Sequence, residues 1–83
     1  MTAPPSGMQI LANGRWIDVT YSEARDFACM VAWEQIPASS SMEHAAAQLR
    51  KRIRGPKAQK CRDAGMEAFR RKRQIWMRTR RKK

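Results

Sequence analysis

Residues 50–83 read RKRIRGPKAQKCRDAGMEAFRRKRQIWMRTRRKK, and this stretch divides the chain into two parts of opposite charge. It holds sixteen of the eighteen Lys and Arg residues against two acids, a net charge of +14. Residues 1–49 hold two bases against five acids, a net charge of −3. So sharp a division predicts a basic segment that binds a polyanion, attached to a small folded head. The alternative, a basic segment that serves only solubility, is disfavoured by this density of charge.

The length of 83 residues allows one small domain. We expect a flexible leader at residues 1–7, a single head at residues 8–66, and a basic helical or mobile tail at residues 67–83. The chain has no apolar run of about 18 residues, which a membrane span needs, and its start lacks the pattern of a secretory signal. We therefore expect no membrane partner and a cytoplasmic location, in a bacterial or phage-infected cell.

Residues 8–19, MQILANGRWIDV, predict a β-hairpin. Asn13 and Gly14 both accept the positive φ of a type I′ turn, so a two-residue loop should join the strands. The resulting register places four aliphatic side chains on one face: Met8, Ile10, Ile17 and Val19. Trp16 lies on the opposite face, where it either packs against Leu11 or contacts another protein.

Thr20-Tyr-Ser-Glu23 has the pattern of a capping box, and a helix should follow it to about Gln35, before Pro37. The side chains of its expected buried stripe are Ala24, Phe27, Ala28 and Val31. Met30 and Trp33 lie beside this stripe. They either widen the core face or form a contact surface for a protein, where Trp and Met are favoured.

Ser40-Ser-Met-Glu43 predicts a second capping box and a helix over residues 42–53, which Gly55-Pro56 should end. A short third helix is expected over residues 56–64, with Pro at its first turn and Gly65 at its end. A further amphipathic helix could run from residue 66 to about residue 77. The predicted fold is mainly α with an N-terminal β-hairpin (α+β), a three-helix head that resembles a helix-turn-helix, followed by a basic C-terminal helix or tail.

Few residues could carry catalysis. Cys29 and Cys61 are the only cysteines and His44 is the only histidine, so the chain lacks the ligand set of a zinc site. Without a secretory signal, we expect both thiols to be reduced and buried rather than joined in a disulfide. No nucleophile–base pair or Gly-rich phosphate loop is apparent, which predicts a protein that is not an enzyme and needs no cofactor.

Three runs in the middle of the chain, SMEHAAAQL (41–49), RIRGPKA (52–58) and CRDAGM (61–66), resemble small Myb/SANT-like helix-turn-helix DNA-binding proteins of bacteria and phages. This resemblance implies a recognition helix that carries Lys57, Gln59, Lys60 and Arg62. The small basic chain with an acidic head is also similar in style to phage regulators that bind RNA polymerase and to ribosomal proteins.

The predicted nucleic-acid site has three kinds of contact. The side chains expected on phosphates are Arg50, Lys51, Arg52, Arg54, Lys57, Lys60, Arg70, Arg71, Lys72 and Arg73. Base edges would be contacted by Gln59, Lys60 and Arg62, because Arg and Lys suit guanine and Gln suits adenine. Trp76 would either stack on an unpaired base or pack within a longer helix.

Three functions fit these features. The first is a non-enzymatic transcription regulator that binds DNA or RNA through residues 50–83. The second is an adaptor that binds RNA polymerase, or another protein of the transcription machinery, through the hairpin edge, Trp16, Met30 and Trp33, and acts on initiation, termination or antitermination. The third is a ribosomal-type protein that binds RNA.

Overall fold

The structure is a computed structural model that describes residues 7–81. Residues 1–6 of the expected leader and residues 82–83 of the expected tail lie outside the described residues. No helix in residues 7–81 is long and apolar enough to cross a membrane.

Two strands near the N-terminus form the predicted hairpin. β1 (Met8–Ala12) pairs antiparallel with β2 (Arg15–Val19), and the Cα partners run from Met8 with Val19 to Ala12 with Arg15. Asn13 and Gly14 have φ values of 53° and 76°, the positive range that a type I′ turn requires. The predicted register is confirmed, and its aliphatic face packs on the core through Met8, Ile10 and Val19.

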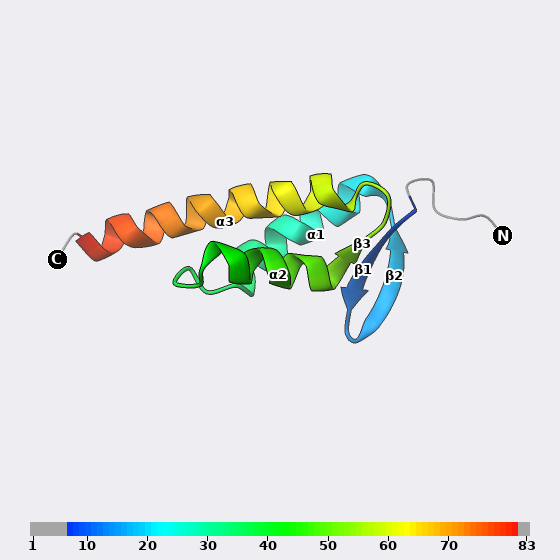
Figure 1. Cartoon of the computed structure of the whole chain (residues 1–83), viewed down its shortest axis with the longest axis horizontal. Coiled ribbons are helices and arrows are strands. Elements are labelled where there is room, and N and C mark those ends of the chain that lie inside the picture. Colours follow the sequence, from blue (N-terminus) through cyan, green and yellow to red (C-terminus); the bar gives the residue numbers. More distant parts are fainter. Residues whose placement is uncertain (1–6, 82–83) are drawn as a thin grey trace.

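A third strand was not expected from the sequence. β3 (Ile53–Arg54) pairs with β1 through Ile10 and Gln9, which gives the strand order β2-β1-β3 (Figure 1). Ile53 was predicted to continue the second helix, but its backbone is extended and its side chain is fully buried. The chain then turns at Gly55, whose φ is 138°, and a Cβ there would lie 2.8 Å from the Gly7 carbonyl oxygen. The helix therefore ends at Arg52, one residue before the predicted end, because Ile53 pairs with β1.

Three helices follow the hairpin in the order α1 (Tyr21–Glu34), α2 (Met42–Arg52) and α3 (Ala58–Arg81). The capping box at α1 is confirmed, because Thr20 Oγ1 accepts from the Glu23 amide at 3.1 Å and Glu23 accepts from the Thr20 amide at 2.8 Å. The cap of α2 is Ser41, not Ser40. The Ser41 hydroxyl accepts from the His44 amide, whereas the Ser40 amide closes the preceding turn on the Pro37 carbonyl.

The expected short third helix and the expected tail helix form one continuous helix of 24 residues, α3. Gly65 was predicted to end a helix, and instead it lies buried in the middle of one. A Cβ at Gly65 would lie 2.9 Å from Leu49 Cδ1 and 3.1 Å from both Cβ and O of Ala28. Glycine is therefore present because α1 and α2 both approach α3 at this point, and not because the chain turns there.

The core lies between the three helices and one face of the sheet. Its largest fully buried side chains are Met8, Val31, Ile36, Leu49, Ile53, Cys61 and Phe69. α1 runs parallel to α3, since Tyr21 contacts Cys61 and Ile36 contacts Lys72, and α2 runs antiparallel to both (Figure 1). Phe69 lies beyond residue 66, so the core includes part of the segment expected as a tail.

Candidate nucleic-acid interface

The last three turns of α3 form a basic rod that we call the distal segment of α3, residues 70–81. Its sequence, RRKRQIWMRTRR, contains seven bases and no acid. The end of α3 runs on past α1 and α2, toward the C-terminus (Figure 1). The sequence predicted the charge of this segment. The structure adds that it is a continuation of a core helix, which fixes its direction relative to the head.

Two bases of the distal segment donate hydrogen bonds to the head, namely Lys72 and Arg73. Lys72 Nζ donates to the carbonyl oxygens of Trp33 and Ile36 at 2.6 Å and is 3.4 Å from that of Ala32. This ammonium group caps the C-terminal end of α1, where carbonyls lack helical partners. Arg73 Nη1 donates to the Ser40 carbonyl at 3.3 Å. Both side chains, predicted as phosphate ligands, are half-buried and join α3 to the head.

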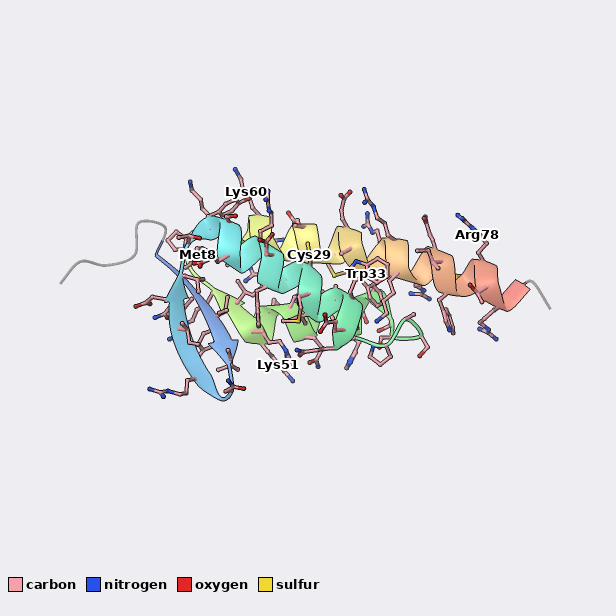
Figure 2. The ribbon with its side chains drawn as sticks, turned by 180° about the vertical axis from the view of Figure 1, so that it is seen from behind. Met8, Cys29, Trp33, Lys51, Lys60 and Arg78 are labelled. Carbon is pink, nitrogen blue, oxygen red and sulfur yellow. The ribbon has the colours of Figure 1, made fainter. Side chains whose placement is uncertain are left out.

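Four bases of α3 are exposed and have no partner among the described side chains: Lys60, Arg70, Arg71 and Arg78. Three of them share one side of the helix, because separations of 11 and 18 residues correspond to nearly whole numbers of turns. We call this set the outer ridge of α3: Lys60, Arg71 and Arg78. Figure 2 shows Lys60 and Arg78 projecting from the same side of α3. Arg70 is likewise exposed but lies nearer to α2, beside Met42.

A second group of bases lies at the end of α2 and on β3. Arg50 and Lys51 are exposed, and no described side chain pairs with them. Lys51 projects on the opposite side of the molecule from Lys60 (Figure 2). Arg52 is half-buried and donates to Gln48, and Arg54 donates to Gln9. The predicted phosphate ligands are thus brought together in two groups on different sides, not in one continuous strip.

The residues expected on a recognition helix lie in the first turns of α3, except Lys57, which precedes it. Gln59 and Arg62 are already engaged. Arg62 donates to the Ile53 carbonyl and to Gln59 Oε1, both at 3.1 Å, and Gln59 Nε2 donates to Asp63 at 2.7 Å. Arg62 therefore braces β3 against α3, and Lys60 is the one member of the predicted base-reading set that is exposed without such a bond.

The packing of α2 on α3 also differs from that of a DNA-binding helix-turn-helix, in which the two helices cross at about 90–120°. Leu49 near the end of α2 meets Gly65, and Met42 at its start borders Arg73 and Met77. The two helices therefore lie side by side along most of α2. The expected short recognition helix is instead the first part of the continuous helix α3.

The three residues predicted as a protein contact do not form one surface. Trp16 is paired with Leu11 as expected and lies under Arg54, whose Cζ is 4.0 Å from the ring centroid. Met30 lines a groove of about 380 Å³ between the hairpin tip and α1. Trp33 lines a different groove, between α1 and α3.

Sequence reasoning missed two arginines of the distal segment. Arg78 is an exposed member of the outer ridge, and Arg80 has its Cζ 4.8 Å from the centroid of the Trp76 ring. Both could have been found by extending the helical periodicity past residue 77, because no Pro or Gly follows it.

The thiols lie in the α1–α3 interface, and both are free. Cys61 is buried, and its burial raises the pKa of the thiol, an effect that the charges of Arg25 and Arg62 partly offset. Cys29 is half-buried, with its Sγ 3.7 Å from the Ala64 carbonyl oxygen. Within the described part of the chain, no group of three or more His, Cys, Asp or Glu side chains is placed to hold a metal ion.

No known protein family, curated protein or solved structure matches this chain. Its function is therefore inferred from its own charges and geometry.

Proposed function

We propose that this protein is a non-enzymatic nucleic-acid-binding protein that regulates transcription, and that it holds the phosphates of DNA or RNA with the exposed bases of α3, of the end of α2 and of the segment that joins them. The observation that carries this proposal is the set of exposed cationic side chains that lack an internal partner: Arg50, Lys51, Lys57, Lys60, Arg70, Arg71 and Arg78. These charges belong to a chain of net charge +11.

Physical chemistry favours a polyanion as the partner of such a surface. Like charges on one small molecule repel one another, and phosphates relieve that repulsion and release their own counterions on binding. The bases of α3 are held on a continuous helix that Lys72 and Arg73 join to the head. Less conformational entropy is then lost when they bind than would be lost by an unfolded tail.

Contacts with base edges should contribute little to the binding of duplex DNA. Gln59 and Arg62 would have to give up their internal hydrogen bonds before they could contact base edges. We therefore expect affinity to depend strongly on salt and weakly on duplex sequence.

The test compares two double variants with the same net charge. Arg71→Gln with Arg78→Gln removes two charges from the outer ridge, whereas Arg15→Gln with Arg25→Gln removes two exposed charges from the head. On duplex DNA, the first pair should reduce the slope of log affinity against log salt by about 1.8, because each phosphate contact contributes about 0.9. The second pair should leave the slope nearly unchanged. Equal effects of the two pairs, or no salt-dependent binding by the wild-type protein, would contradict the proposal.

The sheet edge supports a second candidate, an adaptor that binds RNA polymerase or another protein of the transcription machinery. β2 is an outer strand of the sheet, and the Ile17 side chain on it is 44% exposed. An exposed edge can pair with a strand of a partner. The adaptor predicts that the protein captures polymerase from lysate after nuclease treatment, and that Ile17→Lys abolishes capture. Loss of the polymerase on nuclease treatment would exclude this candidate.

A further inference from the structure

A groove between α1 and α3 lies beside the distal segment and has no role in the proposal above. Its volume is about 320 Å³, and it is lined by Cys29, Trp33, Ala64, Glu67, Ala68 and Arg71. The Trp33 side chain is 44% exposed, although Trp is a residue that folding usually buries to a large extent. An exposed ring at the edge of a groove is suited to a planar ligand.

Trp33 differs from the other two tryptophans in what covers its ring. Arg54 stacks over Trp16 with 4.0 Å from Cζ to the centroid, and Arg80 lies 4.8 Å from the centroid of Trp76. No described cationic side chain lies over the Trp33 ring in this way. Trp33 is therefore the tryptophan whose aromatic face is most available to a ligand, and the sequence had suggested Trp76 for this role.

The other side chains of the groove complement a nucleobase. Ala64 and Ala68 give it a small, apolar lining. Arg71 belongs to the outer ridge, so a strand whose phosphates follow that ridge passes the mouth of the groove. Glu67 also lines the groove, where its carboxylate would repel a phosphate but can accept from the amino group of a base.

The position of the ring is fixed by the cap on α1. The Trp33 carbonyl accepts from Lys72 Nζ at 2.6 Å, so the backbone that carries the ring is tied to the helix that carries Arg71. The two walls of the groove therefore keep their spacing before a ligand arrives, which reduces the cost of ordering them on binding.

We propose that this groove holds an unpaired base of a single-stranded nucleic acid, stacked on Trp33, while Arg71 binds an adjacent phosphate. The inference rests on the proposed function and gives it a substrate class. In a duplex each base is stacked between its neighbours, so its face is not accessible to Trp33, whereas a base of a single strand can be turned outward.

The experiment measures the affinity of the full chain for a mixed-sequence 12-nucleotide DNA strand and for the same strand annealed to its complement. Trp33→Ala should weaken single-strand binding about 5- to 150-fold, the range expected for one base–aromatic stack. Duplex affinity should be unchanged, and the single-strand salt slope should stay the same because no charge is removed. Trp33→Phe keeps an aromatic face and should restore most of the affinity.

A spectroscopic readout separates stacking from loss of fold. In a chain with Trp16→Phe and Trp76→Phe, Trp33 is the remaining tryptophan, and its fluorescence should be quenched by the single strand but not by the duplex. Circular dichroism checks that each variant melts like its parent. If Trp33→Ala weakens the binding of the single strand and of the duplex equally, or weakens neither, the proposed stacking site is wrong. If neither is weakened, Trp33 is left to contact a protein. If the wild-type chain binds neither ligand in a salt-dependent way, the proposed function itself fails.

Discussion

Gly65 sets the distance between three helices because it lacks a side chain. Both α1 and α2 come within 3.1 Å of the position that a Cβ would occupy, and one of the nearest atoms is the backbone oxygen of Ala28. A backbone atom cannot move aside as the end of a flexible side chain can. The single missing methyl group therefore decides how closely α3 packs on the head.

We predict that Gly65→Ala destabilises the protein by up to about 2 kcal/mol, because overpacking a core costs about 1–3 kcal/mol. The higher helix propensity of Ala offsets about 1 kcal/mol of that cost. Urea unfolding followed by circular dichroism measures the change. Gln74→Ala, on an exposed face of the same helix, is the control and should change stability by less than about 0.5 kcal/mol. A more stable Gly65→Ala variant would show that the helices can separate at low cost.

Lys72 and Arg71 are neighbours in sequence with different roles. Lys72→Met keeps the length of the side chain but removes the donor to two carbonyls at 2.6 Å, so stability should fall by about 1.5–3 kcal/mol, as for hydrogen bonds to charged groups. Arg71→Met should leave stability within about 0.5 kcal/mol, because the side chain is exposed. DNA affinity should fall more in Arg71→Met than in Lys72→Met. If Lys72→Met instead weakens DNA binding more and leaves stability unchanged, Lys72 contacts phosphate and not the end of α1.

Cys61 gives the fold a dependence on alkaline pH. Burial raises the pKa of its thiol in the folded state above the ordinary value of 9.0. The folded state therefore holds this proton more tightly than the unfolded state does, and stability should decrease as pH rises from about 9 through the folded pKa. Urea midpoints measured at pH 7 and at pH 10 should differ less in Cys61→Ala than in the wild-type protein. Native thiol labelling at pH 8 should modify Cys29 before Cys61, and the opposite order would contradict this burial.

At the scale of elements, the sequence predicted those whose signals are local. The hairpin follows from Asn13-Gly14, and α1 follows from its capping box, because both depend on residues that are close in sequence. β3 was missed because a strand of two residues is too short to show an alternation of apolar and polar side chains. Ile53 is extended only because Ile10 lies 43 positions earlier in the chain and pairs with it.

The continuity of α3 was missed for a related reason. Gly ends many helices, so Gly65 was interpreted by its usual local role. Its actual role depends on Ala28 and Leu49, which are distant in sequence. The same holds for the candidate site: charge along the chain predicted a basic surface, but the internal bonds of Lys72 and Arg62 appear only after folding.

The part of α3 that contacts the head, through Phe69 and Lys72, is needed for a stable fold. We predict that a chain ended after Met77 still melts cooperatively, because it keeps Phe69 and Lys72, whereas a chain ended after Met66 does not. Phe69 is fully buried, and loss of such a side chain alone costs about 3–5 kcal/mol, much of the stability of a small domain. Thermal melting by circular dichroism checks both chains. Cooperative melting of the shorter chain would show that residues 8–66 fold alone.

At the scale of the whole molecule, residues 1–49 and the distal segment of α3 carry net charges of opposite sign. Exposed acids lie on α1 and at the start of α2, including Glu23, Asp26, Glu34 and Glu43. The distal segment has no acid at all. If the proposed function holds, phosphates should be repelled by these acids and attracted to the distal segment, which would orient the molecule before contact is made.

Because α3 is continuous, the direction of each side chain around its axis is fixed relative to the head. Gly65 and Lys72 fix the rotation of the helix about its axis, so the direction in which Arg78 points is set by the head. One Ala inserted between Gln74 and Ile75 would turn every later side chain by about 100° and move Arg78 off the outer ridge.

Seven inserted residues would turn Arg78 by only about 20° from its original direction and move it about 10 Å outward. If the ridge binds one strand as a unit, the longer insertion should weaken single-strand affinity less than the shorter one. Equal losses would show that the bases act independently of their direction. The direction of the side chains at the end of α3 is therefore set by contacts in the head, several turns away.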